Sequence, residues 1–194
     1  MSQPPLILAS SSPYRRELLA RLNLPFTCAK PDINETRKAE ESAIDLARRL
    51  ATQKALRVAD KYPAAIIIGS DQVAMSGQEI LAKPGDHASA VKQLQKLSGK
   101  TVTFHTGLCV VNAASHNLQV DCIQINVRFR PLEIDEINRY LLVENPYDCV
   151  GSFKSEGYGI TLIDDIQGHD MTALVGLPMI RLCAMLRKEK YQLP

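Results

Sequence analysis

A run of apolar residues, Ala65-Ile66-Ile67-Ile68, lies near the middle of the chain and is followed by Gly69-Ser70-Asp71-Gln72-Val73. An unbroken β-branched run this short is typical of a strand that is buried on both faces. In open α/β sheets, ligands bind beyond the carboxyl ends of such strands. We therefore expect Asp71 at the end of the strand, at the edge of a cleft. The alternative is that Asp71 is a turn residue that caps the strand end, because Gly, Ser and Asp are common there.

Apolar residues with helical spacing predict a long helix over residues 40 to about 61. They form one broad stripe that comprises Ala43, Ile44, Ala47, Leu50, Ala51, Ala55 and Val58. Lys54 lies inside this stripe, so its ammonium must either extend along the apolar surface to water or meet an anion. Similar patterns predict helices over residues 86–97, 132–144 and 177–188.

Extended segments alternate with these helices. Short strands are expected at residues 6–9, 25–29 and 160–163, and a hairpin turn is expected at residues 75–79. The two longest β-type runs are residues 101–112 and 119–130, and the polar turn between them predicts an antiparallel hairpin.

The composition is that of an ordinary soluble globular chain. At 194 residues, one domain or two small lobes are expected. The net charge of +2 implies no strong field for nucleic acid or membrane, and no apolar run is long enough to span a bilayer. The five cysteines are scattered and the four histidines show no ligand spacing. We therefore expect a cytoplasmic protein with reduced core thiols and no zinc framework.

A helix is predicted to begin after the first strand, with Ser12 as its N-cap and Pro13 as its first residue. Arg15 and Arg16 then fall in the first turn, where cations oppose the helix dipole. A bound anion would resolve this conflict, because free N–H groups, hydroxyls and two guanidiniums converge there. The alternative is that both arginines are solvated.

Three further charged features lie in predicted loops. Glu35 follows residues 31–34 and could serve a metal or a sugar, although a lone acid in a loop is usually just solvated. Lys83 precedes Pro84, which holds it in an extended conformation. Lys154 and Glu156 lie in a glycine-rich segment, residues 151–159, that permits close backbone approach to a ligand. They could equally form an ion pair on the surface.

Taken in order, these motifs resemble those of the Maf family of nucleotide pyrophosphatases. They are Ser10-Ser11-Ser12-Pro13-Tyr14-Arg15-Arg16-Glu17-Leu18-Leu19, Glu35, Lys54, Gly69-Ser70-Asp71-Gln72-Val73, Lys83-Pro84 and the segment from Gly151 to Gly157. The resemblance implies a mixed α/β fold over residues 1–194, with a central sheet flanked by helices and two lobes around a cleft, often as a homodimer. It also implies hydrolysis of a nucleoside triphosphate to a monophosphate and pyrophosphate with a divalent metal, Mg²⁺ or Mn²⁺.

The resemblance assigns a role to each charged residue above. Asp71 corresponds to the proton acceptor. The substrate-binding set is Ser10, Arg15, Arg16, Glu35, Lys54, Lys83 and Lys154, in which the five cations bind phosphates. Asp71 and Glu35 are the expected metal ligands, which suits the preference of Mg²⁺ for carboxylate and phosphate oxygens. Whether Asp71 deprotonates water or mainly ligates metal is open from the sequence.

Within the family, the chain resembles the 7-methyl-GTP subgroup. Its marks are Asp71-Gln72, where the dTTP/UTP subgroup has Asp-Thr, and the segment Lys154-Ser155-Glu156, where that subgroup has a glutamine. Tyr14 stands where the subgroup often has tryptophan. Tyr14, Gln72 and Glu156 are therefore the expected specificity residues. The competing functions are a dTTP/UTP pyrophosphatase and a nucleotide-binding regulator of cell division without turnover; no nucleic-acid or membrane partner is expected.

Overall fold

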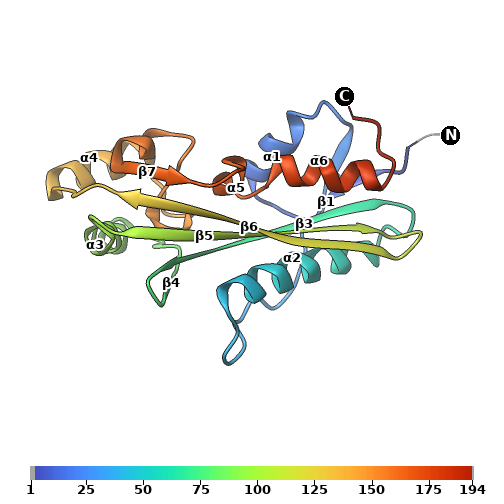
Figure 1. Cartoon of the computed structure of the whole chain (residues 1–194), viewed down its shortest axis with the longest axis horizontal. Helices are drawn as coiled ribbons and strands as arrows, with labels where there is room; N and C mark the ends of the chain where they lie inside the picture. The colour runs from blue at the N-terminus through green and yellow to red at the C-terminus, as the bar shows by residue number, and fades with distance from the viewer. Residues whose placement is uncertain (1–2, 194) are drawn as a thin grey trace. The chain divides into compact units, whose positions relative to one another are not determined.

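The structure, a computed structural model, describes residues 3–193 and forms a seven-stranded mixed sheet flanked by helices (Figure 1). The strands are β1 (Leu6–Leu8), β2 (Phe26–Cys28), β3 (Ile66–Ser76), β4 (Glu79–Leu81), β5 (Thr101–Asn112), β6 (Asn117–Phe129) and β7 (Ile163–Gln167). The helices are α1 (Pro13–Ala20), α2 (Ala43–Ala59), α3 (His87–Leu97), α4 (Ile134–Glu144), α5 (Thr172–Val175) and α6 (Met179–Lys188), with 3₁₀ turns at Val150–Ser152 and Tyr158–Leu162. The mixed α/β prediction is confirmed.

The chain divides into two compact units. The first unit comprises residues 1–72, 106–123 and 170–194, and the second comprises residues 73–105 and 124–169. Strands β3, β5 and β6 contribute residues to both units. The cleft that the family resemblance implies stays a prediction.

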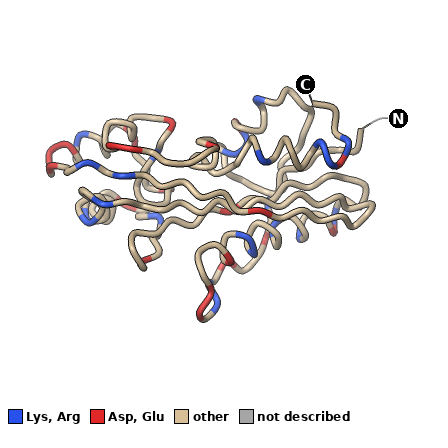
Figure 2. Tube along the Cα trace, viewed as in Figure 1, with Lys and Arg blue, Asp and Glu red and all other residues tan. Residues whose placement is uncertain are grey.

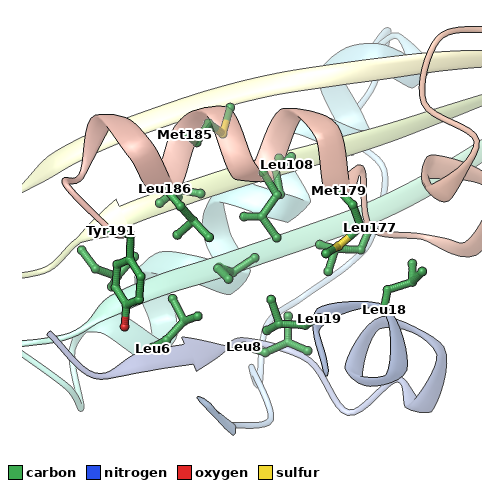
Figure 3. Packing of buried hydrophobic residues seen from close by; sticks show 14 residues of the cluster. Leu6, Leu8, Leu18, Leu19, Leu108, Leu177, Met179, Met185, Leu186 and Tyr191 are labelled. Carbon is green, nitrogen blue, oxygen red and sulfur yellow. The ribbon is translucent and has the colours of Figure 1, made fainter. Parts of the chain in front are cut away.

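In the first unit, β1 pairs in parallel with both β2 and β3. Side chains on β3 alternate between the two faces of the sheet, and each face is covered by different helices. Ile66 and Ile68 pack with apolar residues of α1 and α6, including Leu18, Leu19 and Leu182, as Figure 3 shows for much of this cluster. The side chain of Ile67 packs on the opposite face with residues of α2. Burial on both faces explains the unbroken apolar run of β3.

Helix α2 lies close to the sheet because glycine removes side chains beneath it. A Cβ atom added to Gly69 would overlap the carbonyl oxygen of Ala51, and one added to Gly107 would overlap that of Ala47. Gly69 therefore permits a close helix approach and makes no turn. The prediction that the strand ends before Asp71 is wrong, because β3 continues to Ser76 and pairs there with β4. Asp71 lies within the strand.

In the second unit, β4 pairs antiparallel with β3, and β7 pairs antiparallel with β6. The predicted strand at residues 160–163 is wrong. Residues Tyr158–Leu162 form 3₁₀ turns, and β7 begins at Ile163 and includes the polar residues up to Gln167. The reason is that Gly159 packs against the carbonyl oxygen of Lys154, which holds this segment in a tight loop.

The predicted helices are present, and side-chain caps mark their starts. The side chains of Ser12, Ser42 and Asp86 accept backbone N–H bonds at the starts of α1, α2 and α3. The short helix α5 was not predicted from the sequence. No helix in residues 3–193 combines the length and apolarity needed to cross a membrane. Acidic and basic residues are interspersed along the chain (Figure 2).

The cysteines are free thiols. The prediction of core thiols is right for Cys109, where burial raises the pKa to about 12. It is wrong for Cys28, which is exposed at the end of β2.

Candidate functional site

Lys54 is buried in the first unit and binds two carboxylates. Its Nζ atom lies 2.6 Å from Asp71 Oδ1 and 2.8 Å from Glu35 Oε1. The side chains of Lys54 and Asp71 are 8% and 11% exposed, whereas that of Glu35 is 59% exposed. Of the two sequence-based alternatives, Lys54 therefore meets anions. A buried ammonium between two acids satisfies the requirement that buried charges be paired.

Several features of the fold bring these three residues together. Lys54 projects from the buried stripe of α2, and Asp71 projects from β3 on the face that α2 covers. Glu35 comes from the loop between β2 and α2. The absence of a side chain at Gly69 lets α2 approach closely enough for this contact, because its helix backbone at Ala51 lies directly over the glycine.

Arg15 of α1 is coupled electrostatically to this cluster. Burial lowers the pKa of its guanidinium from the ordinary value, while the charges of Asp71 and Glu35 raise it. Its Nε atom donates to the carbonyl oxygen of Gly176 at 2.8 Å. Arg16 is exposed. Arg15 is thus half-buried and directed toward the interior, so the alternative in which both arginines are solvated fails for this residue.

The serine-rich turn before α1 is held by its own hydroxyls. Ser10 is buried, and its Oγ accepts from the backbone N–H of Ser12 at 3.1 Å. Ser12 in turn caps α1 by accepting from the N–H of Arg15 at 3.4 Å. Tyr14 lies between them and the arginine pair and is half-buried. The turn therefore fixes where the arginine side chains leave the helix.

Gln72 is oriented by α5 in the first unit. Its Nε2 donates to the carbonyl oxygens of Ala173 at 2.8 Å and Leu174 at 3.0 Å, and lies 3.2 Å from Thr106 Oγ1. Thr106 Oγ1 itself donates to the carbonyl of Ala173 at 2.8 Å. Because carbonyls only accept, the amide nitrogen of Gln72 must face α5, and its Oε1 is the acceptor on the opposite side of the amide.

The second unit contains Lys83, Lys154 and Glu156. Lys83 and Glu156 are exposed. Lys154 Nζ lies 3.2 Å from Glu144 Oε1 and 3.2 Å from the Glu144 carbonyl oxygen. Glu144 Oε2 accepts from the backbone N–H of Tyr158 at 2.6 Å. Glu144, the last residue of α4, therefore contacts the glycine-rich segment at both Lys154 and Tyr158.

The carboxylates at Lys54 suit a divalent cation. In residues 3–193 no group of three or more His, Cys, Asp or Glu side chains is placed to hold a metal. Asp71 and Glu35 nevertheless converge on one positive charge, that of Lys54. Two carboxylates with water and phosphate oxygens are a common Mg²⁺ ligand set. The donor chemistry of these two carboxylates therefore fits part of a Mg²⁺ ligand set.

Sequence reasoning missed several residues that position the predicted ones. Ser70, Thr106 and Asp170 form buried or half-buried hydrogen bonds in the first unit, and Glu144 holds the glycine-rich segment of the second unit. Thr106 carried a signal, because it lies in the long predicted strand of residues 101–112, where a buried hydroxyl needs a partner. Ser70 carried no such signal, because the sequence placed it at the end of the predicted strand.

Comparison with known proteins gives the family. Residues 5–189 match the family model described as Maf-like protein. The chain belongs to the Maf family. It is 53% identical to the 7-methyl-GTP pyrophosphatase of Pseudomonas fluorescens (strain Pf0-1) over 190 residues, which cover 98% of this chain and 99% of that protein. It is also 53% identical to the 7-methyl-GTP pyrophosphatase of Pseudomonas aeruginosa, over 98% of this chain and 100% of that protein.

A Maf relative from another genus has the same name. The chain is 51% identical to the 7-methyl-GTP pyrophosphatase of Alcanivorax borkumensis, over 98% of this chain and 97% of that protein. These matches extend over nearly the whole length of each protein, so every element of the fold described above lies within the matched region or within a few residues of it.

Proposed function

We propose that this Maf-family chain is a nucleoside triphosphate pyrophosphatase that hydrolyses 7-methyl-GTP to 7-methyl-GMP and pyrophosphate. The observation that carries the proposal is the buried Lys54, which binds Asp71 and Glu35 beside the electrostatically coupled Arg15. The names of the nearly full-length relatives support the choice of substrate. The reaction would remove a modified nucleotide from the cytoplasmic pool.

The charges of this cluster suit cleavage of a triphosphate. A triphosphate carries about four negative charges near neutral pH, and catalysis of its cleavage is mostly positioning and charge stabilisation. Arg15 and Lys54 would bind phosphate oxygens in the first unit, joined by Arg16. We also assign Lys83 and Lys154 of the second unit as ligands of phosphate oxygens. Buried cations act strongly here because the local dielectric is low.

Asp71 is the proposed proton acceptor. A water oxygen forms a bond to the α-phosphorus, the bond from that phosphorus to the bridging oxygen breaks, and pyrophosphate leaves with that oxygen. The proton released by the water goes to the Asp71 carboxylate. Lys54 holds Asp71 in place through the 2.6 Å contact and keeps the carboxylate charge compensated before the proton arrives.

A divalent metal, Mg²⁺ or Mn²⁺, is the cofactor we propose, and Asp71 and Glu35 would hold it together with phosphate oxygens. When bound it would neutralise charge on the triphosphate and its leaving group. Glu35 is suited to exchange partners, because its side chain is largely exposed even though it contacts Lys54. Removal of divalent cations with a chelator should abolish turnover, and adding Mg²⁺ back should restore it.

Recognition of the base is assigned to Tyr14, Gln72 and Glu156. A 7-methylguanine ring differs from guanine by a delocalised positive charge. An aromatic face attracts such a ring by roughly 0.5–2 kcal/mol. A carboxylate can accept from the guanine N1–H and N2–H while balancing the charge. Gln72 Oε1 can likewise accept a hydrogen bond from a guanine N–H group, because the amide nitrogen of Gln72 already donates to the carbonyls of α5.

The test is pyrophosphate release by the purified protein with 7-methyl-GTP, GTP, UTP and dTTP at equal concentrations. We expect kcat/KM for 7-methyl-GTP to exceed that for the other three by at least tenfold. A preference for UTP and dTTP would instead assign the chain to the other pyrophosphatase activity of the family. Binding of nucleotides with no release from any of them would support a regulator without turnover.

A further inference from the structure

Asp170 is a buried acid that the proposed reaction does not use. It is 5% exposed and lies in the loop that precedes α5. Its Oδ1 accepts from the Thr172 N–H at 3.2 Å and from the Thr172 hydroxyl at 2.5 Å, and its Oδ2 accepts from the Ile180 N–H at 2.8 Å. Thr172 Oγ1 also accepts from the Met179 N–H at 2.8 Å. One carboxylate thus fastens the start of α5 to the start of α6.

The segment fastened in this way contains Gly176, whose φ of 109° places it in the region that favours glycine. The Gly176 carbonyl oxygen accepts from Arg15 Nε at 2.8 Å and from the Ser70 hydroxyl at 2.8 Å. A Cβ atom added to Gly176 would lie 3.1 Å from Arg15 Nε, so the guanidinium also packs directly against this residue. The location of one carbonyl therefore fixes the orientation of Arg15.

The Nε bond has a consequence for phosphate binding. A guanidinium presents its donors in a rigid planar fork, so fixing Nε fixes the direction of the two terminal nitrogens. Bidentate binding of phosphate oxygens depends on that direction. A carbonyl that moved would leave the charge of Arg15 in place but turn its fork away from the ligand.

We propose that Asp170 is a positioning residue for Arg15, which it aligns for phosphate through the α5 segment and the Gly176 carbonyl. A helix cap alone needs one acceptor atom, whereas Asp170 uses both carboxylate oxygens to join two helices. The segment between those helices supplies the acceptor for Arg15. The inference rests on the proposed function, because it takes Arg15 to be a phosphate ligand.

The experiment is a double-mutant cycle that measures binding of inorganic pyrophosphate by calorimetry. The proteins are the wild type, Asp170→Asn, Arg15→Ala and the Arg15→Ala/Asp170→Asn double variant. In Asp170→Asn, the amide can keep one N–H bond but presents a donor where another N–H must be accepted. We expect about tenfold weaker binding for Asp170→Asn, and binding by the double variant within twofold of Arg15→Ala alone. If the affinity losses of the two single variants multiply in the double variant, the proposal is refuted. Wild-type affinity for pyrophosphate in Asp170→Asn would also refute it.

Two further variants separate positioning from folding. Thr172→Val removes the hydroxyl that joins Asp170 to α6, and Thr172→Ser keeps it, so binding should fall in the first and recover in the second. Asp86→Asn is the matched control. It keeps an acceptor for the Ser89 N–H, which Asp86 accepts at 2.8 Å, but removes the negative charge that the N-terminus of α3 favours, so it should lower the melting temperature without weakening pyrophosphate binding. Equal losses of binding in Asp86→Asn and Asp170→Asn would mean that both act only through stability.

Turnover of 7-methyl-GTP by the wild type is measured separately, because it tests the proposed function and not the positioning role of Asp170. Coupling between Asp170 and Arg15 in pyrophosphate binding without hydrolysis of 7-methyl-GTP would uphold the positioning role and overturn the substrate. Hydrolysis of 7-methyl-GTP without that coupling would overturn the positioning role alone. Absence of pyrophosphate binding by the wild type would count against Arg15 as a phosphate ligand and against the inference built on it.

Discussion

At the residue scale, the central feature is Asp71, the proposed proton acceptor, whose carboxylate charge is compensated by Lys54 before any substrate arrives. Asp71 and Lys54 are both buried and lie 2.6 Å apart, so loss of Lys54 would leave Asp71 in the interior without its ion-pair partner, whereas Lys54 would keep Glu35 if Asp71 were lost. The same contact holds the Asp71 carboxylate in one place. The Lys54–Asp71 pair would thus contribute both to the stability of the fold and to the proposed reaction. Substitutions must therefore be chosen to separate a loss of stability from a loss of turnover.

Asp71→Asn should remove turnover while the fold persists. Asparagine has nearly the same shape and can still accept from Lys54 through its oxygen, but it can neither take a proton nor carry charge to a metal. Loss of a general base typically costs about 10²–10⁴-fold. We expect kcat for 7-methyl-GTP to fall at least 100-fold with an unchanged circular dichroism spectrum. Turnover within tenfold of the wild type would exclude Asp71 as the acceptor.

Lys54→Met should destabilise the protein in a way that a second substitution relieves. Methionine fits the apolar stripe of α2 but leaves Asp71 buried without its cation, which costs roughly 3–5 kcal/mol when a buried pair is broken. Adding Asp71→Asn removes the stranded charge, so the double variant should be more stable than Lys54→Met. Urea unfolding measures the free energy of unfolding of both variants. Equal stability of the single and double variants would show that the pair does not share one low-dielectric environment.

At the element scale, sequence patterns were sufficient where a repeating apolar spacing met clear end signals. The stripe of α2 predicted both the helix and the conflict at Lys54, which the structure resolves with two acids. The continuation of β3 past Gly69 was not predicted, because only the position of α2 reveals that this glycine makes room for a backbone. The four-residue α5 has no period long enough to detect, and long-range hydrogen bonds define it.

The start of α4 gives a pH-dependent prediction. Glu136 binds Arg130 and accepts from the Glu133 N–H, and mainly the hydrogen bond from Arg130 lowers its pKa from 4.5 to about 2. A depressed carboxyl pKa contributes stability that is present above pH 4.5 and is lost as the pH falls through about 2. Glu136→Gln should therefore lower the melting temperature at pH 7, and the difference should narrow as the pH falls below 4.5.

Glu79→Gln is the control for this prediction. Glu79 and Lys96 lie 3.4 Å apart with side chains 62% and 67% exposed, a type of ion pair that contributes little. The melting temperature of Glu79→Gln should match that of the wild type throughout the pH range. If the difference in melting temperature between Glu136→Gln and the wild type stays constant down to pH 3, loss of the Glu136 charge is not its cause.

At the scale of the whole molecule, the predicted phosphate ligands are divided between the two units. Arg15 belongs to the first unit and Lys83 to the second. If both bind phosphates, then Arg15→Ala and Lys83→Ala should each lower kcat/KM by a similar factor for 7-methyl-GTP and for GTP, because phosphate contacts do not depend on the base. The ratio of the two kcat/KM values is the measurement, and a loss confined to one nucleotide would contradict the assignment.

Glu156 should behave in the opposite way, since its proposed role concerns the base. Its carboxylate is exposed in the second unit, where Lys154 contacts Glu144. A charged carboxylate gains from the positive 7-methylguanine ring what it cannot gain from neutral guanine, and charge-assisted hydrogen bonds are roughly twice as strong as neutral ones. Glu156→Gln should therefore reduce kcat/KM for 7-methyl-GTP about tenfold more than for GTP. Tyr14→Ala should shift the preference in the same direction, and Tyr14→Trp should preserve or strengthen it. Equal losses on both nucleotides in Glu156→Gln would show that Glu156 supports the loop and does not select the base.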